Sequence, residues 1–445
     1  MKQNYPLLEA EEVLIKLTGI FSHPFNQLLI NRLKQQEFKK EDLFTPENQF
    51  LRNTFYPEFR DLMFLGKKKS SLNVYSKQGT SNIIFQKGNS QNHKEIHAEL
   101  GEIELFLAPN GLHFFSIQLI PLRKDLGSIS DLLFCARNFE TNVTDEGNIR
   151  TWVSWIEQHV LDGIDISTKG NKTINVDEYS GSKFKVFSVI DIAESTHNID
   201  TITRENLLYD LGSVAPIGTA GGNSFYTPND AYFESLLEDK IAVFKNYTML
   251  PMFDTFTVLG HSILTSDNPE SKQYMFLTWH QTYFRIYLFN LFIKYNLFRY
   301  NHEMGDDSVK VRDEFEHFLN TYNLSHLSYN FLPNLIFHHH RKTLQIDEEL
   351  EKFQDRINRI SQAIQEEQQK RSNLLLGLVG AMTTISSFQP VAEYLEIGRK
   401  FTGFGYFSYY PLVCMIAVSV SIPLLGYLFP EKKKKFLRKW KQSNT

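Results

Sequence analysis

The chain has 445 residues, a formal net charge of −4 and a mean hydropathy of −0.31. This balance lacks the basic excess of nucleic-acid-binding proteins, so we expect no direct nucleic-acid binding. Its two cysteines, Cys135 and Cys414, lie in different regions, which argues against a disulfide framework and fits a reducing cytosol.

The N-terminal third carries helical and then β patterns. Residues 5–37 have apolar side chains at helical spacing, which predicts a mainly helical start. A strand is predicted at 82–85. The alternating runs 102–107 and 113–119 flank Asn110-Gly111, a strong short-range signal for a β-hairpin.

The middle of the chain continues as mixed α/β. Its predicted elements are helices at 128–139 and 148–160 and strands at 184–190, 241–247 and 253–259. Residues 272–300 form a long aromatic segment that charged residues interrupt. We therefore predict a buried helix there rather than a membrane span. Further helices are predicted at 311–322 and from residue 325.

A heptad pattern precedes the C-terminal region. Apolar residues alternate steps of four and three at Ile346, Leu350, Phe353, Ile357, Ile360 and Ile364. This spacing keeps one seam facing a partner, and no Pro or Gly interrupts it. We predict one continuous helix over residues 342–388, which we call the stalk helix. An intramolecular coiled coil is the alternative, and continuity into the following apolar segment favours a stalk.

Two apolar segments, 372–394 and 409–429, are each long enough to cross a bilayer. Basic residues flank the pair at 370–371 and 432–441, so both ends are predicted on the cytoplasmic side of the inner membrane. We expect the large N-terminal part to be cytoplasmic too, because the first residues lack a signal-peptide pattern. The alternative is that both segments are core helices.

These patterns predict an α+β cytosolic domain, a stalk helix and two transmembrane helices. The predicted divisions are a mixed α/β domain at 1–310, a helical and stalk region at 311–371, a first span at 372–394, an outer loop at 395–408, a second span at 409–429 and a basic tail at 430–445.

The first predicted span carries a stripe of small and polar residues. Its members step by four and three residues: Asn373, Gly377, Gly380, Thr384 and Ser387. Such a stripe is either a packing face between helices or the lining of a pore in an oligomer. The residues alone leave both interpretations open.

This order of a large mixed domain, long stalk, first span, short loop, second span and basic tail resembles the CorA family of divalent-cation channels. The resemblance implies a funnel-shaped homopentamer with the first span lining the pore. The family's Gly-Met-Asn motif is absent, and residues 387–391 read Ser-Phe-Gln-Pro-Val in its place. Magnesium selectivity is therefore not implied, although Glu393 and Glu396 can attract a divalent cation to the outer mouth. The metal, if any, is left open.

Within that family, the hairpin at 108–119 and the following 121–126 are similar to the CorA-like effectors of type III CRISPR systems. This resemblance implies an antiviral channel that a nucleotide second messenger, SAM-AMP, opens to disrupt the membrane. The alternatives are a magnesium or cobalt transporter and a membrane-anchored scaffold without a pore. No hydrolase, protease or nucleotide-hydrolysis motif is found, so we expect no enzyme and no bound cofactor.

An anionic nucleotide needs basic groups or backbone amides. Arg123, Lys124, Arg137 and Arg150 cluster in the sequence after the hairpin, and guanidinium groups suit phosphate. The glycine-rich loop at 218–224, with Gly221, Gly222 and Asn223, is a second candidate through its amides. Its spacing matches no Walker A or Rossmann fingerprint.

Overall fold

The computed structural model describes residues 8–41, 49–65, 70–79, 81–89, 92–145, 147–161, 181–193, 199–223, 226–264, 268–303 and 308–402. Its contacts divide the chain into two compact units, Met1–Phe353 and Gln354–Thr445. Helices α11 (Ser308–Tyr322) and α12 (Phe331–Thr343), which the sequence grouped with the stalk, belong to the first unit.

The described strands of the first unit form one sheet of eleven strands, in the order β10-β11-β9-β1-β6-β5-β4-β7-β8, with β3 paired to β5 and β2 to β3. Their bounds are β1 Ala10–Ser22, β2 Lys39–Lys40, β3 Asn73–Gln78, β4 Asn82–Asn89, β5 Asn92–Leu107, β6 Leu112–Pro121, β7 Asn142–Asp145, β8 Asn148–Thr151, β9 Lys185–Ile192, β10 Tyr247–Pro251 and β11 Thr255–Gly260. Strands β9 and β11 pair in parallel, and the other strand pairs in this sheet are antiparallel.

The hairpin prediction is confirmed and the N-terminal helix prediction is wrong. Strands β5 and β6 pair across Asn110 and Gly111, where Gly111 adopts a φ of 82°. The start of the chain is strand β1, and only α1 (Gln27–Gln35) is helical within 5–37. Strand β1 lies between β6 and β9 and is buried on both faces, so its apolar residues do not alternate with polar ones.

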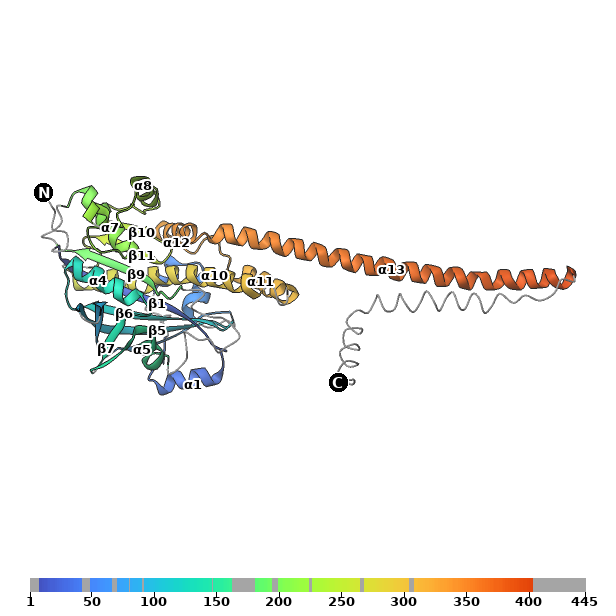
Figure 1. Ribbon diagram of the computed structural model, residues 1–445, viewed down its shortest axis with the longest axis horizontal. Coiled ribbons are helices and arrows are strands. Elements are labelled where there is room, and N and C mark those ends of the chain that lie inside the picture. Colours follow the sequence, from blue (N-terminus) through green and yellow to red (C-terminus); the bar gives the residue numbers. More distant parts are fainter. Residues whose placement is uncertain are drawn as a thin grey trace. The chain divides into compact units, whose positions relative to one another are not determined.

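Helices cover both faces of the sheet, and their labels locate them in Figure 1. On one face lie α4 (Leu126–Arg137), α5 (Trp152–His159) and α7 (Thr201–Ser213), with the Trp152 ring 5.1 Å from that of Phe85. On the other lies α10 (Phe284–Glu303), where the Phe284 ring is 5.5 Å from that of Phe187. The core therefore consists of two apolar layers.

Other predicted elements shift at their ends. The helix predicted at 148–160 begins only at Trp152, because residues 148–151 form β8. The strand predicted at 241–247 is misplaced: Ile241 forms an isolated bridge to Met249, and β10 begins at Tyr247. The other short helices that the structure describes are α2 (Gln49–Thr54), α3 (Pro57–Arg60), α8 (Asp230–Glu238) and the π-helical η2 (Asp61–Leu65) and η4 (Thr219–Asn223).

The aromatic segment at 272–300 is helical, as predicted, and it is buried from Trp279 onward, whereas Tyr274 and Leu277 are exposed. It comprises α9 (Pro269–Leu277), the π-helical turn η5 (Thr278–Tyr283) and α10. Two of the charges that interrupt it are buried and paired: Arg285 bonds Glu41, and Lys294 bonds Glu349. These side chains join α10 to neighbouring elements rather than facing solvent. Lys272 is exposed and pairs with Glu12.

The stalk helix begins later than predicted. Helix α13 (Ile346–Thr402) is continuous over 57 residues, but α12 ends at Thr343. Leu344 and Gln345 form a turn between the two helices, with Gln345 at a φ of 55°. The first seam residues, Ile346, Leu350 and Phe353, are buried in the first unit. There the Phe353 ring lies 4.4 Å from that of Phe315 in α11. This part of the seam is thus an intramolecular contact.

Among the residues that the structure describes, no helix is both long enough and apolar enough to cross a membrane. The predicted second span and the basic tail lie outside the described residues, as does 403–408 of the predicted loop. Residues 395–402 of that loop are helical, because α13 extends to Thr402.

Candidate functional site

A cavity of about 330 Å³ opens beside the start of β9, the loop before β11 and the face of α10. Its lining includes Lys183, Lys185, Phe253, Asp254, Lys294 and Leu344. Three lysines against one aspartate give the lining a formal charge of +2. This cavity lies wholly within the first unit.

Strand pairing places one charged pair in the cavity wall. Lys185 opens β9 and Asp254 immediately precedes β11; the Val186 amide donates to the Asp254 carbonyl at 3.0 Å. The Lys185 ammonium bonds the Asp254 carboxylate, and Arg137 lies 3.9 Å from the other carboxylate oxygen. Burial lowers the pKa of Lys185, although Asp254 opposes that shift. An anion bound against this wall would therefore interact favourably with its positive charges.

Lys294 of α10 also lines the cavity. Its ammonium donates to the Leu344 carbonyl at 2.8 Å and to Glu349 Oε1 at 2.6 Å. Phe253 lies near two cations: its ring centroid is 4.5 Å from Lys185 Nζ and 5.5 Å from Lys294 Nζ. Phe253 is also 54% exposed. An accessible ring flanked by ammonium groups offers a stacking surface beside an anion site.

These features suit an anion that carries a flat ring. Ammonium groups form strong charge-assisted hydrogen bonds with phosphate or carboxylate oxygens. Phe298, 39% exposed, adds a second aromatic surface at the same cavity. The volume lies at the lower end of the range of small-molecule sites.

Two of the residues predicted to bind the ligand lie at a distance from this cavity. Arg123 and Lys124 precede the first turn of α4, whereas Arg137 ends that helix about 18 Å away. Arg123 is 74% exposed at its side chain and bonds Asp125 at 3.1 Å. Lys124 bonds the Glu11 carbonyl and lies 3.4 Å from Glu12. The sequence cluster is therefore not a spatial cluster.

The other two predicted arginines differ from each other. Arg137 is mostly buried and reaches the cavity through Asp254, which it shares with Lys185. Arg150 in β8 is half-buried and bonds the side chain of Gln158 in α5. Of the four predicted basic residues, Arg137 alone contacts a side chain that lines the cavity, within the described residues.

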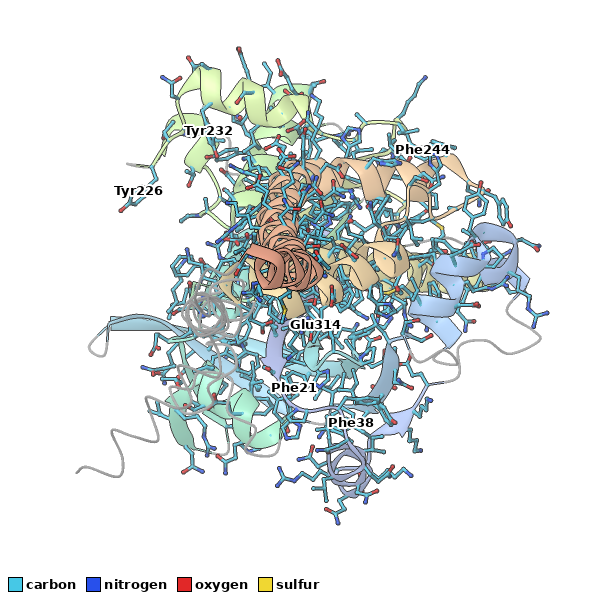
Figure 2. The ribbon with its side chains drawn as sticks, turned by 90° about the vertical axis from the view of Figure 1, so that its right-hand side faces the viewer. Phe21, Phe38, Tyr226, Tyr232, Phe244 and Glu314 are labelled. Atoms are coloured by element: carbon cyan, nitrogen blue, oxygen red, sulfur yellow. The ribbon has the colours of Figure 1, made fainter. Side chains whose placement is uncertain are left out.

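The glycine-rich loop already holds an anion of its own. The Asp210 carboxylate accepts the amides of Gly218 at 2.7 Å and Ala220 at 2.8 Å. Burial raises the pKa of Asp210 to about 6, although these amides favour its charged form. Gly221 and Gly222 are exposed, and the Asn223 side chain lies outside the described residues. Tyr226 follows the loop and projects outward (Figure 2).

The stripe predicted for the first span is described in part. Asn373, Gly377 and Gly380 are exposed on α13, and a Cβ added at either glycine would meet open space. The side chains of Thr384, Ser387, Glu393 and Glu396 lie outside the described residues. The described part of this helix also exposes four large apolar side chains: Leu375, Leu376, Val379 and Met382.

Within the described part of the chain, no group of three or more His, Cys, Asp or Glu residues is arranged to hold a metal ion. Searches of protein-family models, curated proteins and solved structures found no match to this chain.

Sequence reasoning missed Lys183, Lys185, Phe253 and Lys294. Lys185 begins a largely apolar strand, and Lys294 lies among the apolar residues Leu291–Ile293 and Tyr295 of α10. A lysine in such a segment needs a buried partner, which was a usable signal. Lys185 and Lys294 are 109 residues apart in the sequence, so spacing along the chain does not predict that they line one cavity.

Proposed function

We propose that the chain is a ligand-gated membrane ion channel with a CorA-like architecture, opened by a nucleotide that binds its cytosolic N-terminal unit. More specifically, we propose a type III CRISPR antiviral effector that SAM-AMP opens and that then disrupts membrane integrity. The observation that carries the proposal is the position of Leu344 in the wall of the basic cavity, next to the start of α13.

The proposed membrane part supports this function by its sequence pattern. Helix α13 continues without interruption from Ile346 to Thr402 and includes the stripe that begins at Asn373. In this proposal the stripe lines a pore in a homopentamer, because one protomer with two spans cannot enclose a pore. The apolar residues beside the stripe, such as Leu376 and Val379, then contact lipid or neighbouring helices.

Reconstituted protein tests this function directly. The full chain in liposomes is expected to release a trapped fluorescent dye or ions when SAM-AMP is added, and to remain closed without it. Protein-free liposomes with SAM-AMP, and proteoliposomes with AMP, are the controls. Magnesium uptake at the same rate with and without SAM-AMP would instead show a constitutive transporter, and no flux under any condition would favour a scaffold.

A further inference from the structure

We infer that the basic cavity is the site at which the nucleotide binds, and that its phosphate competes with Glu349 for the Lys294 ammonium group. This inference rests on the proposed function for the identity of the ligand. It adds the location of the binding site and names Lys294 as the side chain through which ligand binding affects α13.

The cavity divides into a charged part and an aromatic part. Lys183 and Lys185 are two residues apart at the start of β9, and Lys294 comes from α10. Lys183 forms no salt bridge with any residue that the structure describes, so its ammonium is available to a ligand. Phe253 adjoins both Lys185 and Lys294. A phosphate near the lysines therefore places its attached base or ribose close to the exposed ring.

Size restricts what the cavity encloses. A volume of about 330 Å³ accepts roughly one nucleotide half of a ligand such as SAM-AMP. The phosphate is the part that the lysines recognise. The other half of the ligand then extends toward solvent past the exposed side chains of Phe253 and Phe298.

Lys294 links this site to α13. It bonds the carbonyl of Leu344, the residue that follows α12, and Glu349 in the first turn of α13. Between them lies Gln345, whose left-handed backbone separates the two helices. A phosphate that takes over the hydrogen bond that Lys294 now donates to Glu349 leaves this carboxylate without its cation. The first turn of α13 then loses one restraint, and because the helix is continuous, a rotation there is carried along it.

The two sites predicted from the sequence are less suitable. Arg123 is mostly exposed and bonded to Asp125, and Arg150 bonds Gln158 at the surface of β8. In the glycine-rich loop, Asp210 already accepts the amides of Gly218 and Ala220. By contrast, the cavity combines a concave surface, excess positive charge and an accessible ring.

Binding of SAM-AMP to the full chain in detergent, measured by isothermal titration calorimetry, tests the site. Lys183→Ala and Lys294→Met are each expected to weaken binding about tenfold or more, because each removes a charge-assisted hydrogen bond. Glu349→Gln is expected to strengthen binding severalfold by removing the competitor. Lys310→Ala, an exposed lysine on α11, is the matched control and is expected to bind as the original chain does.

Thermal unfolding of each variant shows whether it is folded, and binding is compared only between folded variants; if Lys294→Met does not fold, Lys294→Gln replaces it. Binding within twofold of the original in both cavity variants, or a loss in Arg123→Ala instead, overturns the site. ATP serves as a second probe. If the chain binds ATP but not SAM-AMP, and both cavity variants lose ATP, the site stands and the proposed messenger is wrong.

Discussion

The Lys294 ammonium group in α10 lies 2.6 Å from Glu349 Oε1 in the first turn of α13 and also faces the basic cavity. The Lys294 side chain therefore lines a candidate ligand site and also bonds the first turn of α13, the longest of the described helices. A cation in this position can exchange a protein carboxylate for a ligand phosphate.

We expect Glu349→Gln to favour the open state without ligand. Removing the carboxylate breaks its bond to Lys294, as ligand binding is proposed to do. A partly exposed ion pair is worth about 0.5–1 kcal/mol, so the SAM-AMP concentration for half-maximal flux should fall about two- to fivefold. Flux in proteoliposomes measures it.

Asp347→Asn is the matched control. Asp347 lies in the same turn of α13 as Glu349 and bonds Arg341 of α12, but it does not line the cavity. An equal shift in both variants would mean that any disturbance of this turn opens the channel. No shift in Glu349→Gln would contradict the exchange of partners.

The stripe on α13 gives a test that separates a pore lining from a packing face. Asn373→Leu places an apolar ring in a proposed pore, and apolar constrictions block ions by excluding water. We expect flux to fall at least tenfold while Asn373→Ser retains it. Leu376→Met, an exposed position beside the stripe, is expected to change flux little.

Assembly is measured in parallel, by the mass of the oligomer in detergent. Loss of flux with an unchanged oligomer supports a pore lining. Loss of the oligomer in Asn373→Leu would assign the stripe to helix packing instead.

The sequence predicted those elements whose signal is local. Asn110 and Gly111 specify a tight turn, so the β5–β6 hairpin was correctly placed. Strand β1 was mistaken for a helix because both its faces are buried, which removes the alternation that identifies a strand. The break at Gln345 was missed because no Gly or Pro marks its positive φ.

The candidate site depends on contacts that are distant in sequence. Arg137 was proposed from its charge and does reach Asp254, but its sequence neighbours Arg123 and Lys124 lie at the other end of α4. Lys185 and Lys294 line the same cavity because β9 and α10 pack against one another. Pairing between strands and helices, rather than spacing along the chain, brings these charges together.

A buried ion pair on the α10 face of the sheet is expected to be a major determinant of stability. Lys16 and Glu104 are both almost inaccessible, with Nζ and Oε2 2.5 Å apart. Lys16→Met leaves the carboxylate without this cation and should lower the free energy of unfolding by about 3 kcal/mol. This value is at the low end for a broken buried ion pair, because Arg285 lies 4.0 Å from Glu104. Urea denaturation followed by tryptophan fluorescence measures the loss.

The double variant Lys16→Met with Glu104→Leu is expected to recover most of that stability, since it removes both buried charges. A double variant as unstable as the sum of the single variants would show that the two side chains act independently, contrary to this pairing.

Glu102, two residues from Glu104 on β5, should make stability depend on pH. Burial, and then the negative charge of Glu104, raise the pKa of Glu102 to about 7 from an ordinary 4.5. The charged or titratable groups around it are Glu104, Lys16, Glu41, His280 and Arg285. His280 lies 3.4 Å from the Glu102 carboxylate, but burial, Lys16 and Arg285 lower its pKa, so it is neutral near pH 7.

Between pH 4.5 and 7 the folded state therefore holds a proton on Glu102 that the unfolded state has lost. Its contribution to stability falls as pH rises through this window and is constant above pH 7. Glu102→Gln removes the cost of ionisation, so it should stabilise the chain by roughly 2 kcal/mol at pH 8 and by much less at pH 5. Urea denaturation at the two pH values measures this. An equal effect at both would show that Glu102 ionises normally in the folded chain.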